Sequence, residues 1–188
     1  MKNQYEIAKE TILKSDYEIK GLKTFMGMEG YGVNASLYYK GKKIAFIIDD
    51  GNGGCLNIDY LDAKKYSYVP SHITEFLKTL PSFTNKEQGF EFREDEIDRI
   101  DEEDFCNILI NHKLDQREFK KCLNKVSVLT DDDKISTYKA KASDLDKKYN
   151  FKEGIMTFRD YVLRDKSIQL ILNDMPKDDA YDVYMQHR

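Results

Sequence analysis

The chain has 188 residues, with 30 basic and 34 acidic side chains and a formal net charge of −4. A compact protein of this length buries about 70% of the surface that its unfolded chain exposes, so it can fold without disulfides or metals. The mildly acidic balance argues against direct, nonspecific binding of duplex DNA. No segment approaches the roughly 18 apolar residues that a membrane span requires, so we expect no membrane association and a cytoplasmic location.

The three cysteines are Cys55, Cys106 and Cys122. Their number is odd, and their spacing is too wide for the paired cysteines of a zinc knuckle. Each lies in an otherwise apolar segment, so we expect three reduced thiols in the core of an intracellular protein.

The first part of the sequence predicts a helix followed by a β-meander. Residues 3–14 place Tyr5, Ala8 and Ile12 on one helical face. Four short segments rich in β-branched and aromatic residues then predict strands, at 17–25, 32–39, 43–49 and 55–61. The third of them is apolar on both faces between Ile44 and Ile48, which predicts the central strand of an antiparallel sheet.

Two loops of this meander are rich in glycine, and eight of the ten glycines lie between residues 21 and 54. In an up-and-down sheet, the loops at 26–32 and 49–54 emerge at the same end, so we expect them to meet at one rim. A structural hairpin is one interpretation of the second loop, since its glycines supply positive φ angles. The alternative is a site for a small ligand, formed by Asp49, Asp50, Gly51, Asn52, Gly53 and Gly54.

The remaining sequence predicts helices and a second β unit. Apolar spacing predicts a helix between Pro70 and Pro81. Two more helices are expected at 102–112 and 115–125, the last of them with a capping box formed by Asp115 and Glu118. Further along we expect strands at 125–130 and 134–140, helices near 143–149 and at 155–164, a strand at 167–172, and a short helix that begins near 174–176.

These elements together predict an α+β fold. It consists of an N-terminal four-stranded antiparallel meander with flanking helices, then a helical segment and a smaller C-terminal α/β unit. The expected domains are 1–83 and 102–188, joined by an acidic connector at 84–101.

Several short stretches resemble motifs of known enzyme sites, but the secondary structure predicted around them does not fit those motifs. The glycines at 51–54 precede a strand rather than a helix, which excludes a dinucleotide fingerprint and a P-loop. The aspartates at 131–133 do not continue with the spacing of a calcium-binding EF-hand. No serine or cysteine partner is visible for the three histidines, His72, His112 and His187. We therefore predict no catalytic residues, no cofactor and no metal ligands.

The segment from Glu87 to Asp104 holds ten carboxylates and two arginines, a local net charge of −8. One interpretation is a solvated linker or helix face. The other is a surface for a basic groove, because carboxylates three or four residues apart on a helix lie about 5–6 Å from each other and can imitate phosphates. The spacing of Ile97, Ile100 and Ile108 predicts a helix through this region. Such a helix would direct five acidic residues outward: Glu94, Asp95, Asp98, Glu102 and Glu103.

Aromatic residues are frequent, with thirteen tyrosines and ten phenylalanines. Exposed tyrosines are favoured at recognition surfaces because they offer a large contact area at a small entropic cost. Among the tyrosines near the meander, Tyr31 and Tyr38 are our candidates for contact with a partner. Core positions with a hydrated hydroxyl group are the alternative.

The meander sequence GLKTFMGMEGYGVNASLYYKGKKIAFIIDDGNGGCLNIDY, residues 21–60, resembles small uncharacterised proteins of phages and mobile elements in low-GC bacteria. In those proteins a GxxGxG turn leads into an ALY-type strand, a GKK turn, an apolar strand and a GxGG turn. The terminal SIQLILNDMPKDDAYDVY, residues 167–184, is similar to their ends. The resemblance implies action in a bacterial host cell and brings no established activity or catalytic residue.

Two hypotheses of function follow. The first is a non-enzymatic interaction protein, a phage-type accessory factor or anti-defence inhibitor. Its acidic and tyrosine-rich surfaces would bind a host protein or ribonucleoprotein that has a basic groove. The second is an enzyme or binding module at the glycine-rich rim, where Asp49 and Asp50 would hold a metal ion or a small polar ligand. We favour the first, because no catalytic constellation assembles in the sequence.

Overall fold

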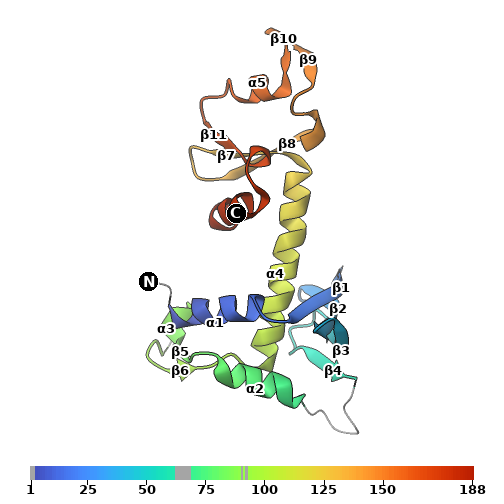
Figure 1. Ribbon diagram of the computed structural model, residues 1–188, viewed down its shortest axis with the longest axis vertical. Helices are drawn as coiled ribbons and strands as arrows, with labels where there is room; N and C mark the ends of the chain where they lie inside the picture. Colours follow the sequence, from blue (N-terminus) through green and yellow to red (C-terminus); the bar gives the residue numbers. More distant parts are fainter. Residues whose placement is uncertain (1–2, 62–68, 90, 92) are drawn as a thin grey trace. The chain divides into compact units, whose positions relative to one another are not determined.

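The computed structural model describes residues 3–61, 69–89, 91 and 93–188. The chain divides into two compact units, Met1–Leu114 and Asp115–Arg188, called unit 1 and unit 2 below. The division falls within a single helix, α4 (Glu102–Leu123) (Figure 1). It differs from the predicted division, since the segment expected to be a connector belongs to unit 1, and its described residues at 84–88 and 97–98 are in helix or strand there. In the described part of the chain, no helix has both the length and the apolar character needed to cross a membrane.

The predicted α+β fold is confirmed, and the predicted meander is the centre of unit 1. Helix α1 (Gln4–Leu13) begins at the N-cap Asn3, whose side chain accepts a hydrogen bond from the Glu6 amide. It leads into a sheet with the order β1-β2-β3-β4, in which each neighbouring pair is antiparallel. The four strands are Tyr17–Met26, Tyr31–Tyr39, Lys42–Asp49 and Asn57–Tyr60.

One face of this sheet packs against helices. Leu37 and Ile47 are fully buried in a core that also takes Ile12 from α1 and Phe105 from α4. The opposite face is open, and Phe46 and Ile48 on β3 are 43% and 45% exposed. The strand is interior to the sheet as predicted, but burial on both of its faces is not observed. Phe46 and Ile48 are therefore not covered by a second layer of the core of unit 1.

The segment after the sheet builds the rest of unit 1. Helix α2 (Ser71–Thr79) lies between the two prolines as predicted. The segment expected to be a connector folds into the short strands β5 (Phe83–Thr84) and β6 (Ile97–Asp98), which pair around helix α3 (Asn85–Gln88). The side chain of Glu87 in α3 accepts hydrogen bonds from the backbone amides of Thr84 and Gln4, which ties this segment to α1.

The two helices predicted at 102–112 and 115–125 are one continuous helix, α4. The intervening residues Lys113 and Leu114 are good helix formers, and neither glycine nor proline interrupts them. Asp115 is therefore no helix cap, and the predicted capping box with Glu118 is wrong. Within unit 2, Asp115 forms an ion pair with Arg188.

Unit 2 has a three-stranded sheet with the order β11-β7-β8 and a separate hairpin, β9–β10. Its small core contains Val126, Leu145 and Val162. The helices predicted near 143–149 and at 155–164 are wrong in part, because a short 3-10 turn and the start of β9 occupy the first range, and β10 occupies the start of the second before helix α5 begins. The elements are β7 (Lys125–Thr130), β8 (Ile135–Lys141), the 3-10 turn η1 (Ala142–Asp144), β9 (Lys148–Phe151), β10 (Gly154–Thr157), α5 (Phe158–Val162), β11 (Ile168–Ile171), the 3-10 turn η2 (Leu172–Asp174) and α6 (Lys177–His187).

Candidate functional site

The two glycine-rich loops of unit 1 pack directly against each other. In the β1–β2 loop the Gly27 amide donates to the Gly30 carbonyl at 2.7 Å, and the Glu29 amide donates across to the Gly51 carbonyl at 2.9 Å. A Cβ atom at Gly27 would lie 2.5 Å from the Gly51 carbonyl oxygen, so only glycine fits where the two backbones touch. The predicted meeting of the loops at one rim is therefore observed.

Side chains of the β3–β4 loop complete this interlock. The Asp49 carboxylate accepts from the Gly51 amide at 2.8 Å, and the Asp50 carboxylate accepts from the Asn52 amide at 3.0 Å. Both are hydrogen bonds across two residues, the pattern with which aspartate stabilises turns. The Asn52 side chain in turn accepts from the Met28 amide of the other loop at 3.2 Å. The polar groups of this loop thus fix the loop itself.

The remaining two residues of the predicted ligand site are Gly53 and Gly54. Gly53 has a φ of 74°, and a Cβ atom there would lie 2.4 Å from the Glu29 carboxylate, whereas Gly54 has open space around it. Among the residues that the structure describes, no three His, Cys, Asp or Glu side chains are grouped so that they could hold a metal ion. The geometry of the loop is explained by the hairpin interpretation, and a ligand at Asp49 and Asp50 stays a prediction.

The interlocked loops present three large side chains to solvent. Met26, Met28 and Tyr31, called the tip below, are 71%, 92% and 70% exposed. Tyr31 is a predicted partner-binding residue, whereas sequence reasoning did not select the two methionines. The signal that could have found them is the sequence MGM, residues 26–28, inside a hairpin loop where exposed apolar residues are not needed for folding.

The second predicted tyrosine lies apart from the tip. Tyr38 is seven residues from Tyr31 on the same strand, a separation of about 23 Å, and an odd separation places the two on opposite faces. Tyr38 is half-buried, and the Lys20 ammonium lies 4.7 Å from the centre of its ring. The structure therefore does not combine these two tyrosines into one surface.

The acidic segment does not form the predicted helix through Ile97 and Ile100. Helix α4 begins only at Glu102. The Asp101 carboxylate accepts a hydrogen bond from the Asp104 amide at 2.8 Å and so caps the helix at its N-terminus. Before it, Arg93 has a φ of 51° and leads into a turn. A helical row of carboxylates from residue 94 to residue 103 is thus excluded.

The five acidic candidates are instead distributed over two places. Glu94, Asp95 and Asp98 are exposed in the segment around β6, where Glu94 pairs with Lys86 at 2.9 Å. Glu102 and Glu103 lie in the first turn of α4, where negative charge is favoured by the helix dipole. A phosphate-like row is lost, but an acidic surface in unit 1 is retained.

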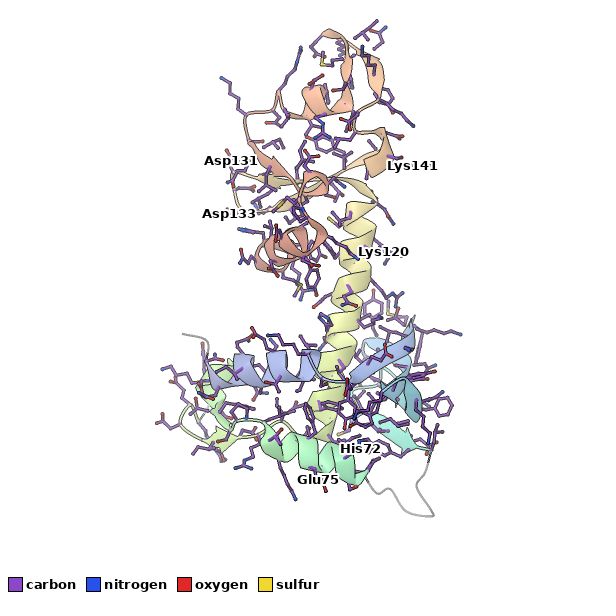
Figure 2. The ribbon with its side chains drawn as sticks, viewed as in Figure 1. His72, Glu75, Lys120, Asp131, Asp133 and Lys141 are labelled. Atoms are coloured by element: carbon purple, nitrogen blue, oxygen red, sulfur yellow. The ribbon has the colours of Figure 1, made fainter. Side chains whose placement is uncertain are left out.

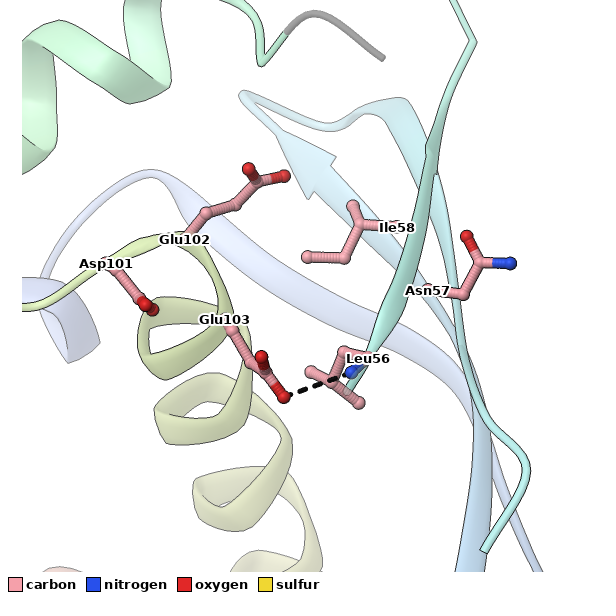
Figure 3. Close-up of a pocket in the computed structure, with 6 residues that line it drawn as sticks. All are labelled: Leu56, Asn57, Ile58, Asp101, Glu102 and Glu103. Atoms are coloured by element: carbon pink, nitrogen blue, oxygen red, sulfur yellow. Dashed lines mark hydrogen bonds between the residues drawn. The ribbon is translucent and has the colours of Figure 1, made fainter. Parts of the chain in front are cut away.

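The first turn of α4 borders an open pocket of about 510 Å³. Figure 3 shows Asp101, Glu102 and Glu103 on one side of it and the chain from Leu56 to Ile58 on the other. The Glu103 carboxylate accepts from the Leu56 amide at 3.0 Å, which fixes the start of β4 to the helix. With three carboxylates on its wall, the pocket suits a cationic group such as an arginine or lysine side chain of a partner.

Two buried protonated groups lie behind this pocket. Burial raises the pKa of the Tyr60 hydroxyl, and the Glu102 carboxylate raises it further. Burial also raises the pKa of the Cys106 thiol, to about 12, with a smaller effect of the acidic neighbours. Both groups therefore stay protonated at neutral pH and supply no nucleophile. Cys106 is buried as predicted, as is Cys122, while the prediction of a core position is wrong for Cys55, which is exposed.

An aromatic cluster in unit 1 was missed by sequence reasoning. The His72 ring stacks on Tyr39 with the ring centres 4.5 Å apart, and its Nδ1 lies 2.7 Å from the Tyr17 hydroxyl oxygen. The Tyr17 hydroxyl donates a hydrogen bond to the His72 carbonyl at 3.2 Å. Figure 2 shows His72 and the neighbouring Glu75 on α2. Burial lowers the pKa of His72 more than Glu75 raises it, which favours the neutral form of the ring.

We predict that unit 1 loses stability as the pH falls below about 6.5, the pKa of an unfolded histidine. The pKa of His72 is lower in the folded chain, so the unfolded chain binds a proton that the folded chain does not. Denaturant unfolding at about pH 7.5 and about pH 5.5 measures this loss. The variant His72→Gln is expected to show a smaller loss, and an equal loss in both proteins would contradict the assignment.

Comparisons with models of protein families, with curated proteins and with solved structures found no match to this chain.

Proposed function

We propose that the chain is a non-enzymatic interaction protein that binds a partner protein through the tip. The observation that carries the proposal is the exposure of Met26, Met28 and Tyr31 on a loop whose backbone is fixed by contacts between glycines. Isolated exposed apolar residues are common, but a cluster of large ones on a small, rigid loop is typical of a binding site.

The tip has the physical properties of a binding element. Burial of a methionine side chain contributes about 1.5–3 kcal/mol, and Met28 at 92% exposure has nearly all of this to gain. Methionine adapts to irregular apolar cavities, and tyrosine is enriched at interfaces. The hydrogen bonds from the Met28 and Glu29 amides to the neighbouring loop already order the backbone, so little backbone entropy is lost on binding.

Acidic residues define the expected chemistry of the partner. Glu29 and Asp50 are exposed beside the tip, and unit 1 also exposes Glu94, Asp95 and Asp98. We infer a partner with an apolar cavity and basic residues near it, as in a protein or ribonucleoprotein that handles nucleic acid. The resemblance to phage proteins supports a host complex as this partner and an accessory or anti-defence role.

Affinity capture from a bacterial lysate tests the proposal, followed by titration of the purified captured protein. We expect stoichiometric, salt-sensitive binding, since charges at the edge of an interface act mainly on association rate and salt dependence. Charge reversal at Glu94, Asp95, Asp98 and Glu102 is expected to weaken it. The matched control reverses four exposed acidic residues of unit 2, which are Glu153, Asp178, Asp179 and Asp182.

The same protein preparation tests the alternative at Asp49 and Asp50. Calorimetry with divalent metal ions and with nucleotides would detect a ligand at the rim. Heat of binding that disappears in Asp49→Ala and Asp50→Ala variants with an intact fold would favour the ligand-binding module. Capture of a partner that tolerates both the charge reversal and the loss of the tip would contradict the proposed interaction protein.

A further inference from the structure

The β7–β8 hairpin of unit 2 carries opposite charges at its two ends. Its turn holds Asp131, Asp132 and Asp133, and its open end begins and finishes with the lysines Lys125 and Lys141. Figure 2 shows Asp131 and Asp133 on one side of unit 2, with Lys141 and Lys120 on the other. The net charge of the whole chain does not reveal this separation of acidic and basic residues.

Four exposed lysines form the basic end, called the lysine patch below: Lys120, Lys125, Lys139 and Lys141. Lys125 and Lys141 are direct cross-strand partners, an arrangement of like charges that destabilises a sheet. Lys139 lies two residues before Lys141 on β8 and is exposed as well. Lys120 lies in the last turn of α4, where the helix dipole favours a positive charge.

The lysines of the patch are not neutralised within unit 2. In this fully described part of the chain, no carboxylate lies within 4.0 Å of any of the four ammonium groups, whereas Lys134 at the opposite end pairs with Asp132 at 2.6 Å. The carboxylate nearest in sequence to Lys141 is that of Asp144, which pairs with Lys147 at 2.5 Å and offsets the charge of Lys141 only in part, so repulsion between Lys125 and Lys141 remains. An external anion would remove it.

A pocket of about 370 Å³ adjoins the patch, and its polar lining residues are Glu118, Lys121, Lys125, Thr137, Tyr184 and Arg188. Lys121 is paired with Glu118, and Arg188 with Asp115, so Lys125 contributes the uncompensated charge. The pocket gives room for an anionic group next to Lys125 and offers the Thr137 hydroxyl as a further donor.

We propose that the lysine patch binds the phosphate backbone of nucleic acid. Lysine is depleted in protein–protein interfaces, whereas it neutralises phosphates and releases their counterions. The exposed apolar residues of unit 2 that a protein partner would bury, such as Ile155 and Leu163, lie on other segments, in β10 and after α5. The four lysines contact phosphates and not base edges, so binding follows charge and not sequence. This inference concerns unit 2 and does not depend on the proposed function of the tip in unit 1.

Fluorescence anisotropy with a labelled oligouridine strand and the full chain tests the proposal. For single strands the slope of log affinity against log salt is about −0.7 for each phosphate contact, so four lysines predict a slope near −3. The double variant Lys125→Gln, Lys141→Gln removes two contacts and is expected to reduce the slope by about 1.4. It also removes the like-charge pair, so it is expected to fold at least as stably as the original chain.

The matched control is Lys152→Gln, Lys166→Gln, which removes two exposed lysines elsewhere in unit 2 and is expected to leave the slope unchanged. A second titration uses a duplex DNA probe. If the patch variant loses affinity for this probe as well, the patch binds the phosphate backbone of both single strands and duplexes. The proposal is overturned if the strand does not bind at low salt, or if the two double variants behave alike. Competition by polyglutamate or inorganic phosphate as effective as that by the strand would also overturn it.

Discussion

Replacement of Gly27 by alanine is expected to destabilise unit 1 by about 1–3 kcal/mol, the usual cost of forcing additional atoms into a packed region. The new Cβ atom would lie 2.5 Å from the Gly51 carbonyl oxygen and 2.7 Å from the Asp50 carbonyl oxygen. Both obstacles are backbone atoms, which cannot rotate away as a side chain would. The two loops must separate, and hydrogen exchange of the Glu29 amide, which bonds to Gly51, is expected to accelerate.

Gly30 in the same loop provides the matched control. A Cβ atom there has nothing within 4 Å, and the residue lies outside the left-handed region of backbone conformation. Gly30→Ala is therefore expected to change stability by no more than about 0.5 kcal/mol. If the two alanine variants unfold at the same denaturant concentration, the interlock of the loops does not hold unit 1 together in the way that its geometry indicates.

Replacement of Phe105 by alanine is expected to cost about 3–5 kcal/mol, a large part of the 5–15 kcal/mol that stabilises an ordinary domain. The Phe105 side chain is fully buried and packs edge-on against Tyr17, with the ring centres 5.1 Å apart. It comes from α4 and therefore connects this helix to strand β1. Urea unfolding followed by tyrosine circular dichroism measures the loss.

Ile97 provides the control for a truncation of an apolar residue in the same unit. It is 73% exposed, so Ile97→Ala removes little buried surface and is expected to change stability by no more than about 0.5 kcal/mol. A small effect at Phe105, comparable to that at Ile97, would mean that α4 is not part of the core of unit 1.

Local chemistry explains why much of unit 1 could be predicted from sequence. The alternation at 33–39 and the glycine breaks define the strands, because side chains of a half-buried sheet alternate and tight turns need glycine. The contact between Gly27 and Gly51 follows from the antiparallel order, which brings alternate loops to one end. The exposure of Phe46 could not be predicted, since it depends on which face of the sheet the helices cover.

Predictions failed where one pattern fits two structures. The apolar spacing between Ile97 and Ile108 fits a helix, but the helix begins only after Asp101. An aspartate can either lie inside a helix or cap its start with its side chain, and here Asp101 caps it. At 155–164 the predicted helix begins late. Gly154, with a φ of 117°, begins strand β10, and Thr157 then caps helix α5. The cluster of Tyr17 and His72 joins residues 55 apart in sequence and has no local signal.

The most direct test of a binding role for the tip is calorimetric titration of the captured partner with the variant Met28→Ser. The control is Ile155→Ser, which removes a 75% exposed apolar side chain of strand β10 in unit 2, away from both the tip and the acidic residues of unit 1. Loss of about 1.5–3 kcal/mol of apolar burial corresponds to a dissociation constant at least tenfold larger, and we predict this increase for Met28→Ser only. Equal affinity of the two variants and the original chain would contradict the assignment of the tip as the binding surface.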